Sequence, residues 1–152
     1  MLSIKAYTDG SCLGNPGVGG YAGVMVANGK KRRCCGYSRK PDETNQRMEL
    51  KALICVLDWI NKYQKQPCNI EFCVDNKTLI DCSKHSDYSL MAPERKNNDL
   101  WIEYIQKRDA GKHIVTFTKV PAHSDCAFNN EADTLAKSMA KKARFEAFGL
   151  QV

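Results

Sequence analysis

The stretch Asp9-Gly10-Ser11-Cys12-Leu13-Gly14-Asn15-Pro16-Gly17 decides how the rest of the chain is interpreted, because it lies at the end of the first strand-like segment. Residues 2–9 alternate in polarity as a strand does, and the run rich in Gly and Pro then predicts a loop. The run places one carboxylate just before backbone that another molecule can approach closely. This arrangement suits a metal ion held against a polyanion.

Two further strand-like segments follow the loop, at residues 19–27 and 31–38. They are joined by Ala27-Asn28-Gly29-Lys30, and an Asn-Gly pair between two alternating segments is a strong hairpin signal. The first part of the chain is therefore predicted to form three consecutive antiparallel strands.

A long helix is predicted to follow the third strand. It opens at Pro41-Asp42-Glu43-Thr44, with Asp42 or Thr44 as the N-cap. Glu49 lies on the same side of this helix as its apolar stripe, which consists of Leu53, Val56, Leu57 and Ile60. A carboxylate on a buried face normally needs a cation or a metal, so the fold alone does not explain Glu49.

The second half of the chain alternates strands with helices. A strand at 68–74 ends at Asp75, a short helix starts at Asn76, and a helix over 98–108 carries Trp101 as a core residue. A fifth strand at 113–119, a loop over 120–129 containing His123, and a last helix from about 127 to 146 follow. The right-handed crossover rule makes the later strands parallel to the first. We expect one α/β domain over residues 1–152, with a five-stranded mixed sheet (three antiparallel strands, then parallel strands) flanked by helices.

Composition narrows the class of protein further. The chain has 152 residues and a net charge of +6, which favours a polyanionic partner only weakly. Its eight cysteines contain no Cys-x-x-Cys pair, so they are interpreted as small buried hydrophobic residues of a protein in a reducing compartment. A zinc site built from Cys68, Cys73 and His85 is a weaker alternative. No apolar run is long enough to cross a bilayer, and we expect a cytoplasmic monomer that does not bind membranes.

Four acids remain once the elements are assigned: Asp9, Glu49, Asp75 and Asp133. Asp9 could cap a turn and Asp75 could cap a helix, while Asp133 leans toward the packed side of the last helix. Convergence of all four at one edge of the sheet suits Mg²⁺ or Mn²⁺, which prefer oxygen ligands. Paired acids also hydrolyse glycosides, but the neighbouring Gly, Asn, Thr, Arg and Lys residues favour phosphates over sugars.

Several motifs of the chain resemble those of the type 1 (bacterial RNase HI-like) ribonuclease H family, over residues 3 to about 142. They are Tyr7-Thr8-Asp9-Gly10-Ser11-Cys12-Leu13-Gly14-Asn15-Pro16-Gly17, Thr44-Asn45-Gln46-Arg47-Met48-Glu49-Leu50, Val74-Asp75-Asn76, Asn97-Asn98-Asp99-Leu100-Trp101 and Asn129-Asn130-Glu131-Ala132-Asp133. The resemblance implies an RNase H-like fold and cleavage of the RNA strand of RNA/DNA hybrids, leaving 5′-phosphate and 3′-hydroxyl ends.

The same resemblance implies roles for individual residues. Asp9, Glu49, Asp75 and Asp133 would hold two Mg²⁺ ions when substrate is bound, with Mn²⁺ as a possible replacement, and His123 would assist proton movement or product release. The groups that would bind the hybrid fall into three sets: those that read RNA 2′-hydroxyls (Asn15, Glu49, Asn76 and the backbone around Gly10, Cys12 and Gly14), those that hold a DNA phosphate (Arg39, Thr44 and Asn97), and those that enter the minor groove (Asn45 and Gln46).

The chain departs from the family between Asp75 and Trp101, where bacterial members carry a basic handle helix that contains Trp. The stretch from Lys84 to Lys96 is only mildly basic and has no Trp, so we expect a shortened handle and weaker hybrid binding. Two basic clusters could compensate: Lys30, Lys31, Arg32 and Arg33, or Lys137, Lys141, Lys142 and Arg144. Two alternatives stay open, a polymerase-associated domain that needs a partner and a catalytically silent hybrid-binding module. The silent module would require the loss of an acid, and none is lost.

Overall fold

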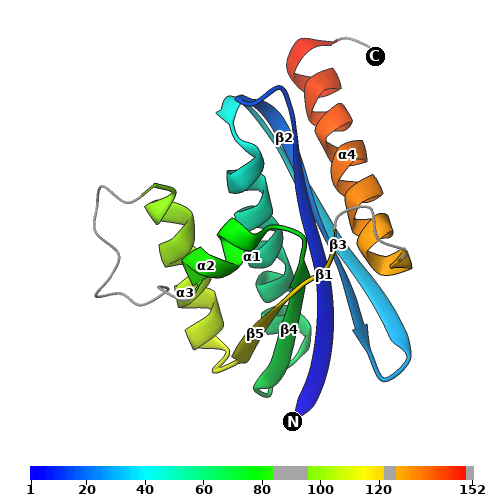
Figure 1. The fold of residues 1–152 in the computed structure, drawn as a ribbon, viewed down its shortest axis with the longest axis vertical. Coiled ribbons are helices and arrows are strands. Elements are labelled where there is room, and N and C mark those ends of the chain that lie inside the picture. Colours follow the sequence, from blue (N-terminus) through cyan, green and yellow to red (C-terminus); the bar gives the residue numbers. More distant parts are fainter. Residues whose placement is uncertain (84–95, 122–125, 150–152) are drawn as a thin grey trace.

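The fold was taken from a computed structural model, which describes residues 1–83, 96–121 and 126–149. The elements in chain order are β1 (Leu2–Leu13), β2 (Gly17–Ala27), β3 (Lys30–Glu43), α1 (Asn45–Tyr63), β4 (Cys68–Val74), α2 (Lys77–Ser83), α3 (Asn98–Ala110), β5 (Ile114–Lys119) and α4 (Ala127–Phe148) (Figure 1).

The strands form one five-stranded sheet in the order β3-β2-β1-β4-β5. β1, β2 and β3 pair antiparallel, whereas β4 is parallel to β1 and β5 is parallel to β4. The predicted mixed sheet is thus confirmed. Asn28 and Gly29 have φ values of 51° and 73°, so both residues of the β2–β3 turn adopt the left-handed conformation that an Asn-Gly hairpin needs.

The first strand is longer than predicted. The expectation of a loop from Gly10 onward was wrong for residues 10–13, which continue the strand. β1 pairs with β4 only as far as Tyr7, opposite Cys73. Its antiparallel pairing with β2 continues to Leu13, opposite Val18. Glycines weaken a strand locally, but here the ladder with β2 supplies hydrogen bonds that no local pattern reveals. β1 therefore extends past the end of β4.

Helices cover both faces of the sheet (Figure 1). On one face the main core joins α1 and α3 to the strands, through buried side chains such as Leu57, Phe72 and Ile105. Trp101 is 1% exposed within it, which confirms Trp101 as a core residue. On the other face α4 packs through Ala132, Ala136, Ala140 and Ala143, whereas Leu135 and Met139 of the same helix are only half-buried.

The first helix begins where one of the two proposed caps placed it. Thr44 is the N-cap, and its hydroxyl accepts a hydrogen bond from the Arg47 backbone N–H at 3.2 Å. Asp42 was the wrong alternative, because it lies in β3, whose ladder with β2 runs on to Glu43 opposite Gly17.

All eight cysteines are free, but only Cys68 and Cys73 are fully buried and Cys35 is exposed. The interpretation as small buried residues is therefore correct for those two and wrong for Cys35. His85, the third ligand of the alternative zinc site, lies outside the described residues, as do residues 84–95 of the shortened handle. In the part of the chain that the structure describes, no helix is long and apolar enough to cross a membrane.

Candidate active site

Two of the four acids are brought together because β1 extends past the end of β4. Asp75 directly follows Val74, the last residue of β4. Asp9 lies in the part of β1 that has lost β4 as a neighbour and pairs only with β2, opposite Ala22. Both carboxylates therefore gather at the same edge of the sheet, where the carboxyl ends of parallel strands commonly bind ligands.

Glu49 reaches this edge because Gly10 lets the first turns of α1 lie directly on β1. A Cβ atom at Gly10 would stand 2.3 Å from the Met48 carbonyl carbon and 2.4 Å from the Glu49 backbone nitrogen. Any larger residue would push α1 away from the strand. The glycine after Asp9 thus brings the third carboxylate to the first.

Asp9, Glu49 and Asp75 each offer a carboxylate oxygen, and these oxygens lie within 4.8 Å of one another. All three residues are half-buried. Three acidic oxygens converge at this point with only partial access to water, which fits a hard divalent cation such as Mg²⁺ or Mn²⁺ better than it fits a solvated surface.

The electrostatics of the cluster agree with this fit. Burial raises the pKa of Asp9 to about 8, together with a hydrogen bond to Asp133 and the charge of Asp75. Burial also raises the pKa of Glu49 to about 7, against the lowering effect of a hydrogen bond from Asn76. Carboxylates that resist ionisation because they are buried and lie close to one another are stabilised when a dication enters.

Asp133 approaches the cluster from the opposite face of the sheet. Gly20 of β2 allows α4 to pack closely, since a Cβ there would lie 2.4 Å from the Ala136 carbonyl oxygen and 2.4 Å from the Ala140 nitrogen. The Asp133 carboxyl hydrogen-bonds to Asp9 and forms an ion pair with Lys137 at 3.1 Å. Its side chain is 42% exposed. His123 lies outside the described residues.

Asn76 holds Glu49 in place. Its side-chain amide donates a hydrogen bond to the Glu49 carboxylate, and its Oδ1 accepts one from the Leu79 backbone N–H at 3.2 Å. Asn76 therefore ties the start of α2 to the acidic cluster. A substrate hydroxyl at this place would meet both an amide and a carboxylate.

The glycine-rich hairpin between β1 and β2 is tied to the N-terminus of α1. The Cys12 backbone N–H donates to Asn45 Oδ1 at 2.8 Å, and the Asn45 N–H donates to Asn15 Oδ1 at 3.2 Å. Gly14, with φ of 89°, is exposed between them. These bonds bring together Cys12, Asn15 and Asn45, which the sequence had assigned to two different parts of the substrate.

Arg47 was missed by the sequence analysis, yet it connects two predicted phosphate-binding residues. Its backbone N–H is capped by Thr44, and its guanidinium donates to Asn97 Oδ1 at 3.4 Å and to both carboxylate oxygens of Asp99 at 2.9 and 2.8 Å. It also pairs with Glu43, which is 2% exposed. The i, i+4 spacing of Glu43 and Arg47 was the one signal in the sequence that could have indicated this pair.

Two predicted substrate-binding residues remain, Gln46 and Arg39. Gln46 is half-buried in the first turn of α1, beside Asn45. Arg39 is exposed in β3, and no hydrogen bond or ion pair among the described residues joins it to Thr44 or Asn97. The structure therefore brings Thr44 and Asn97 together through Arg47, and not through Arg39.

The sheet order and the acidic cluster at its edge together place a candidate divalent-metal site where β4 ends beside β1. A model of the RNase H family matches residues 2–141. The chain belongs to the ribonuclease H family and is a nuclease.

Several named proteins are similar to this chain. A ribonuclease H of Prosthecochloris aestuarii is 37% identical over 150 residues, covering 93% of this chain and 97% of the relative. One from Moorella thermoacetica is 33% identical, covering 91% of each. Among solved structures, LC9-RNase H1, described as a type 1 RNase H with the type 2 active-site motif, has a TM-score of 0.79 at 25% identity and covers 94% of this chain and 74% of that one. LC11-RNase H1, solved with an RNA/DNA hybrid, has a TM-score of 0.76 at 21% identity and covers 93% and 99%, a likeness of fold.

Proposed function

We propose that this chain is an endoribonuclease that hydrolyses the RNA strand of RNA/DNA hybrids and leaves 5′-phosphate and 3′-hydroxyl ends. One observation carries the proposal: carboxylate oxygens of Asp9, Glu49 and Asp75 lie within 4.8 Å of one another, and Asp133 is hydrogen-bonded to Asp9. Support for the substrate comes from LC11-RNase H1, which has the same fold and was solved with such a hybrid.

Asp9, Glu49, Asp75 and Asp133 would hold two Mg²⁺ ions in the substrate complex, with Mn²⁺ as a replacement. Such ions supply an activated water and stabilise the leaving oxygen of an in-line displacement. Asp9 and Glu49, whose pKa values are raised to about 8 and about 7, must lose their protons before the site can work. We further propose that His123 assists proton movement or product release.

The hybrid would lie across the hairpin and the start of α1. Asn15, Asn76 and the exposed backbone at Gly14 face the RNA strand in this proposal, and the 2′-hydroxyl distinguishes that strand from DNA. Thr44 and Asn97 would hold a phosphate of the DNA strand. The Asn97 Nδ2 atom is buried and has no hydrogen-bond partner among the described residues, so it is an unused donor that suits a phosphate oxygen.

The proposal is tested with the isolated chain and four labelled substrates: an RNA/DNA hybrid, duplex RNA, duplex DNA and single-stranded RNA. We expect Mg²⁺-dependent cleavage of the hybrid and of none of the other three substrates. The products should carry 5′-phosphate and 3′-hydroxyl ends, which a ligase joins to a partner strand that supplies the matching 3′-hydroxyl or 5′-phosphate. Asp9→Asn should abolish cleavage, whereas Asp58→Asn, at a side chain 55% exposed and paired with Lys107, should retain it.

The outcomes separate the competing classes. Hybrid binding without cleavage would overturn the nuclease proposal in favour of a silent module. Cleavage that requires an added polymerase would favour a partner-dependent domain. Size-exclusion chromatography of the active chain tests the further expectation that it works as a monomer.

A further inference from the structure

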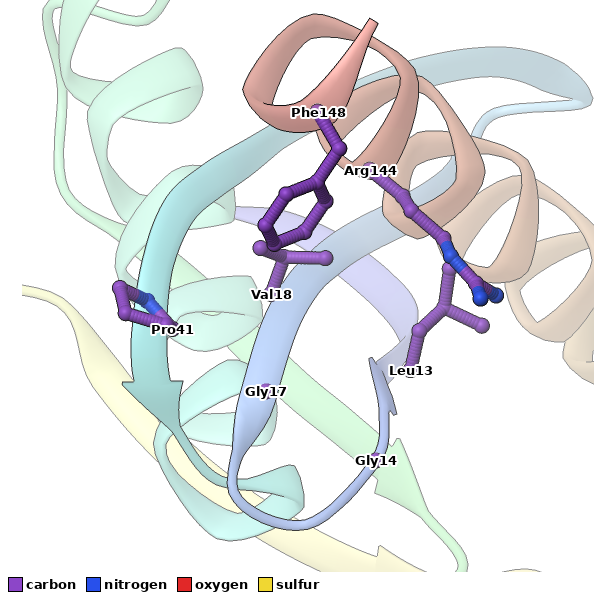
Figure 2. A pocket seen from close by; sticks show the side chains of 7 residues that line it. All are labelled: Leu13, Gly14, Gly17, Val18, Pro41, Arg144 and Phe148. Carbon is purple, nitrogen blue, oxygen red and sulfur yellow. The ribbon is translucent and has the colours of Figure 1, made fainter. Parts of the chain in front are cut away.

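A pocket that contains none of the four acids lies between the β1–β2 hairpin, β3 and the last turns of α4. Figure 2 shows the residues around it, and its volume is about 450 Å³. It is lined by two glycines of the hairpin and by side chains from four elements, namely Leu13, Gly14, Gly17, Val18, Pro41, Arg144 and Phe148.

Arg144 gives this pocket a positive charge. Across the described parts of the chain, no carboxylate lies within ion-pair distance of the Arg144 guanidinium, which extends toward Leu13 in Figure 2. Two other basic residues of α4 are engaged, since Lys137 pairs with Asp133 and Lys142 lies over the ring of Tyr37 at 5.4 Å, and Lys141 does not line the pocket. Of the second basic cluster, Arg144 is therefore the residue best placed to take a phosphate.

Phe148 gives the same pocket an aromatic surface. It is 59% exposed in the last turn of α4, and its ring stands over Val18 with Pro41 across the opening (Figure 2). An exposed ring beside a guanidinium that has no carboxylate partner matches the two parts of a nucleotide. The ring stacks on the base and the guanidinium binds the phosphate.

The place of the pocket connects it to the proposed substrate. Gly14 belongs both to the pocket and to the hairpin that would read the RNA strand. Leu13 lies on the same strand as Asp9, about 13 Å further along at about 3.3 Å per residue. At the spacing of about 3.4 Å per nucleotide in a stacked strand, about four nucleotides cover that distance.

We propose that this pocket is a subsite for one unpaired nucleotide of the RNA strand where that strand continues past the hybrid. Arg144 binds its phosphate and Phe148 stacks on its base. An unpaired nucleotide is required, because the bases within a duplex are already stacked on both faces and cannot reach Phe148. The inference rests on the proposed function, since it extends the path of the same RNA strand.

The experiment compares KM for a blunt hybrid with KM for hybrids that carry a three-nucleotide single-stranded extension, of RNA or of DNA, at either end. We expect an RNA extension at one end to lower KM about tenfold, within the range that base stacking on an aromatic side chain provides. Arg144→Gln and Phe148→Ala should each remove most of this advantage. Phe145→Ala and Lys141→Gln, on the same helix but outside the pocket, should keep it.

The dissociation constants of blunt and extended hybrids should differ by the same factor as their KM values. They are measured by fluorescence anisotropy in the Asp9→Asn background, so that binding is separated from cleavage. Equal KM values for blunt and extended hybrids would overturn the subsite while leaving the proposed function intact. An equal benefit from DNA extensions would overturn its assignment to RNA. An equal loss in Phe145→Ala would overturn the role of Phe148. Failure of the wild type to cleave any hybrid would instead overturn the proposed function.

Discussion

Replacement of Arg47 by methionine tests whether the buried ion network at the start of α1 stabilises the fold. Glu43 is 2% exposed and is held by two cations, Arg47 at 3.1 Å and Lys51 at 2.9 Å. Methionine keeps much of the side-chain volume of arginine but leaves Glu43 with one cation. Removal of one partner from a buried pair costs about 3–5 kcal/mol, and because Lys51 remains we expect about 3 kcal/mol.

The second partner of Arg47 contributes little to this figure. Asp99 is 64% exposed, and an ion pair at that exposure is worth about 0–1 kcal/mol despite its two hydrogen bonds. The decisive quantity is therefore the coupling to Glu43. If Glu43 is first replaced by Gln, Arg47→Met no longer leaves a buried carboxylate short of a cation, and its cost should fall to about 1 kcal/mol.

Urea unfolding at pH 7, followed by circular dichroism, measures the four free energies of this cycle. Lys107→Met is the matched control, because its partners Asp58 and Glu103 are 55% and 43% exposed, and it should cost at most about 1 kcal/mol. A loss below about 1 kcal/mol for Arg47→Met, or the same loss with Gln at position 43, would refute the reasoning.

The pH dependence supplies an independent check on the same network. Burial raises the pKa of Glu43, but hydrogen bonds from Ser38, Lys51 and Arg47 outweigh it and hold this pKa below its usual value. A lowered carboxyl pKa contributes stability above the unfolded value of about 4.3 that is lost as pH falls through the folded value. Arg47→Met should therefore move acid unfolding to higher pH.

Three further predictions concern the site and the sheet. Asp9→Asn should stabilise the metal-free protein by about 2 kcal/mol at pH 7 in urea unfolding with EDTA, and a metal-free variant no more stable than the wild type would contradict the raised pKa. Because the pKa of Asp9 is raised to about 8, the wild type loses stability as pH rises from about 4 to about 8. The stability that Asp9→Asn gains over the wild type should therefore grow across that range. Gly20→Ala should lower both the free energy of unfolding, by about 2 kcal/mol, and kcat, because its Cβ would displace α4 and Asp133; normal kcat would show that α4 tolerates the shift. His113 accepts the Cys68 N–H at 3.0 Å, and burial lowers its pKa, so stability should fall as pH drops below about 6.5. His113→Gln should flatten that slope between pH 7 and pH 5, as measured by thermal unfolding.

Much of the fold could be predicted because its signals are local. The Asn28-Gly29 turn, the alternation in residues 68–74 and the apolar stripe of α1 each depend on neighbours a few residues apart, and the structure confirms all three elements. The four acids could be selected in the same way, because each lies next to a recognisable motif or on an unsuitable helix face.

Other features depended on segments far apart in the chain. Continuation of β1 to Leu13 depends on its ladder with β2, and the entry of Glu49 depends on α1 backbone lying against Gly10. The Arg47 network joins α1 to α3, and the pocket at Arg144 and Phe148 joins the end of α4 to a hairpin near the start of the chain. Residue types and spacing do not determine such distances.

By itself, therefore, the sequence determined which strands and helices form, which strands run antiparallel or parallel, and which carboxylates are candidates for the metal. Only the tertiary structure decided that three of them converge within 4.8 Å, and that the run from Gly10 to Leu13 is a strand rather than a loop. The physical reason is that local preferences act between close neighbours in the chain, whereas a metal site requires side chains from β1, α1, β4 and α4 to meet, and packing alone sets that geometry.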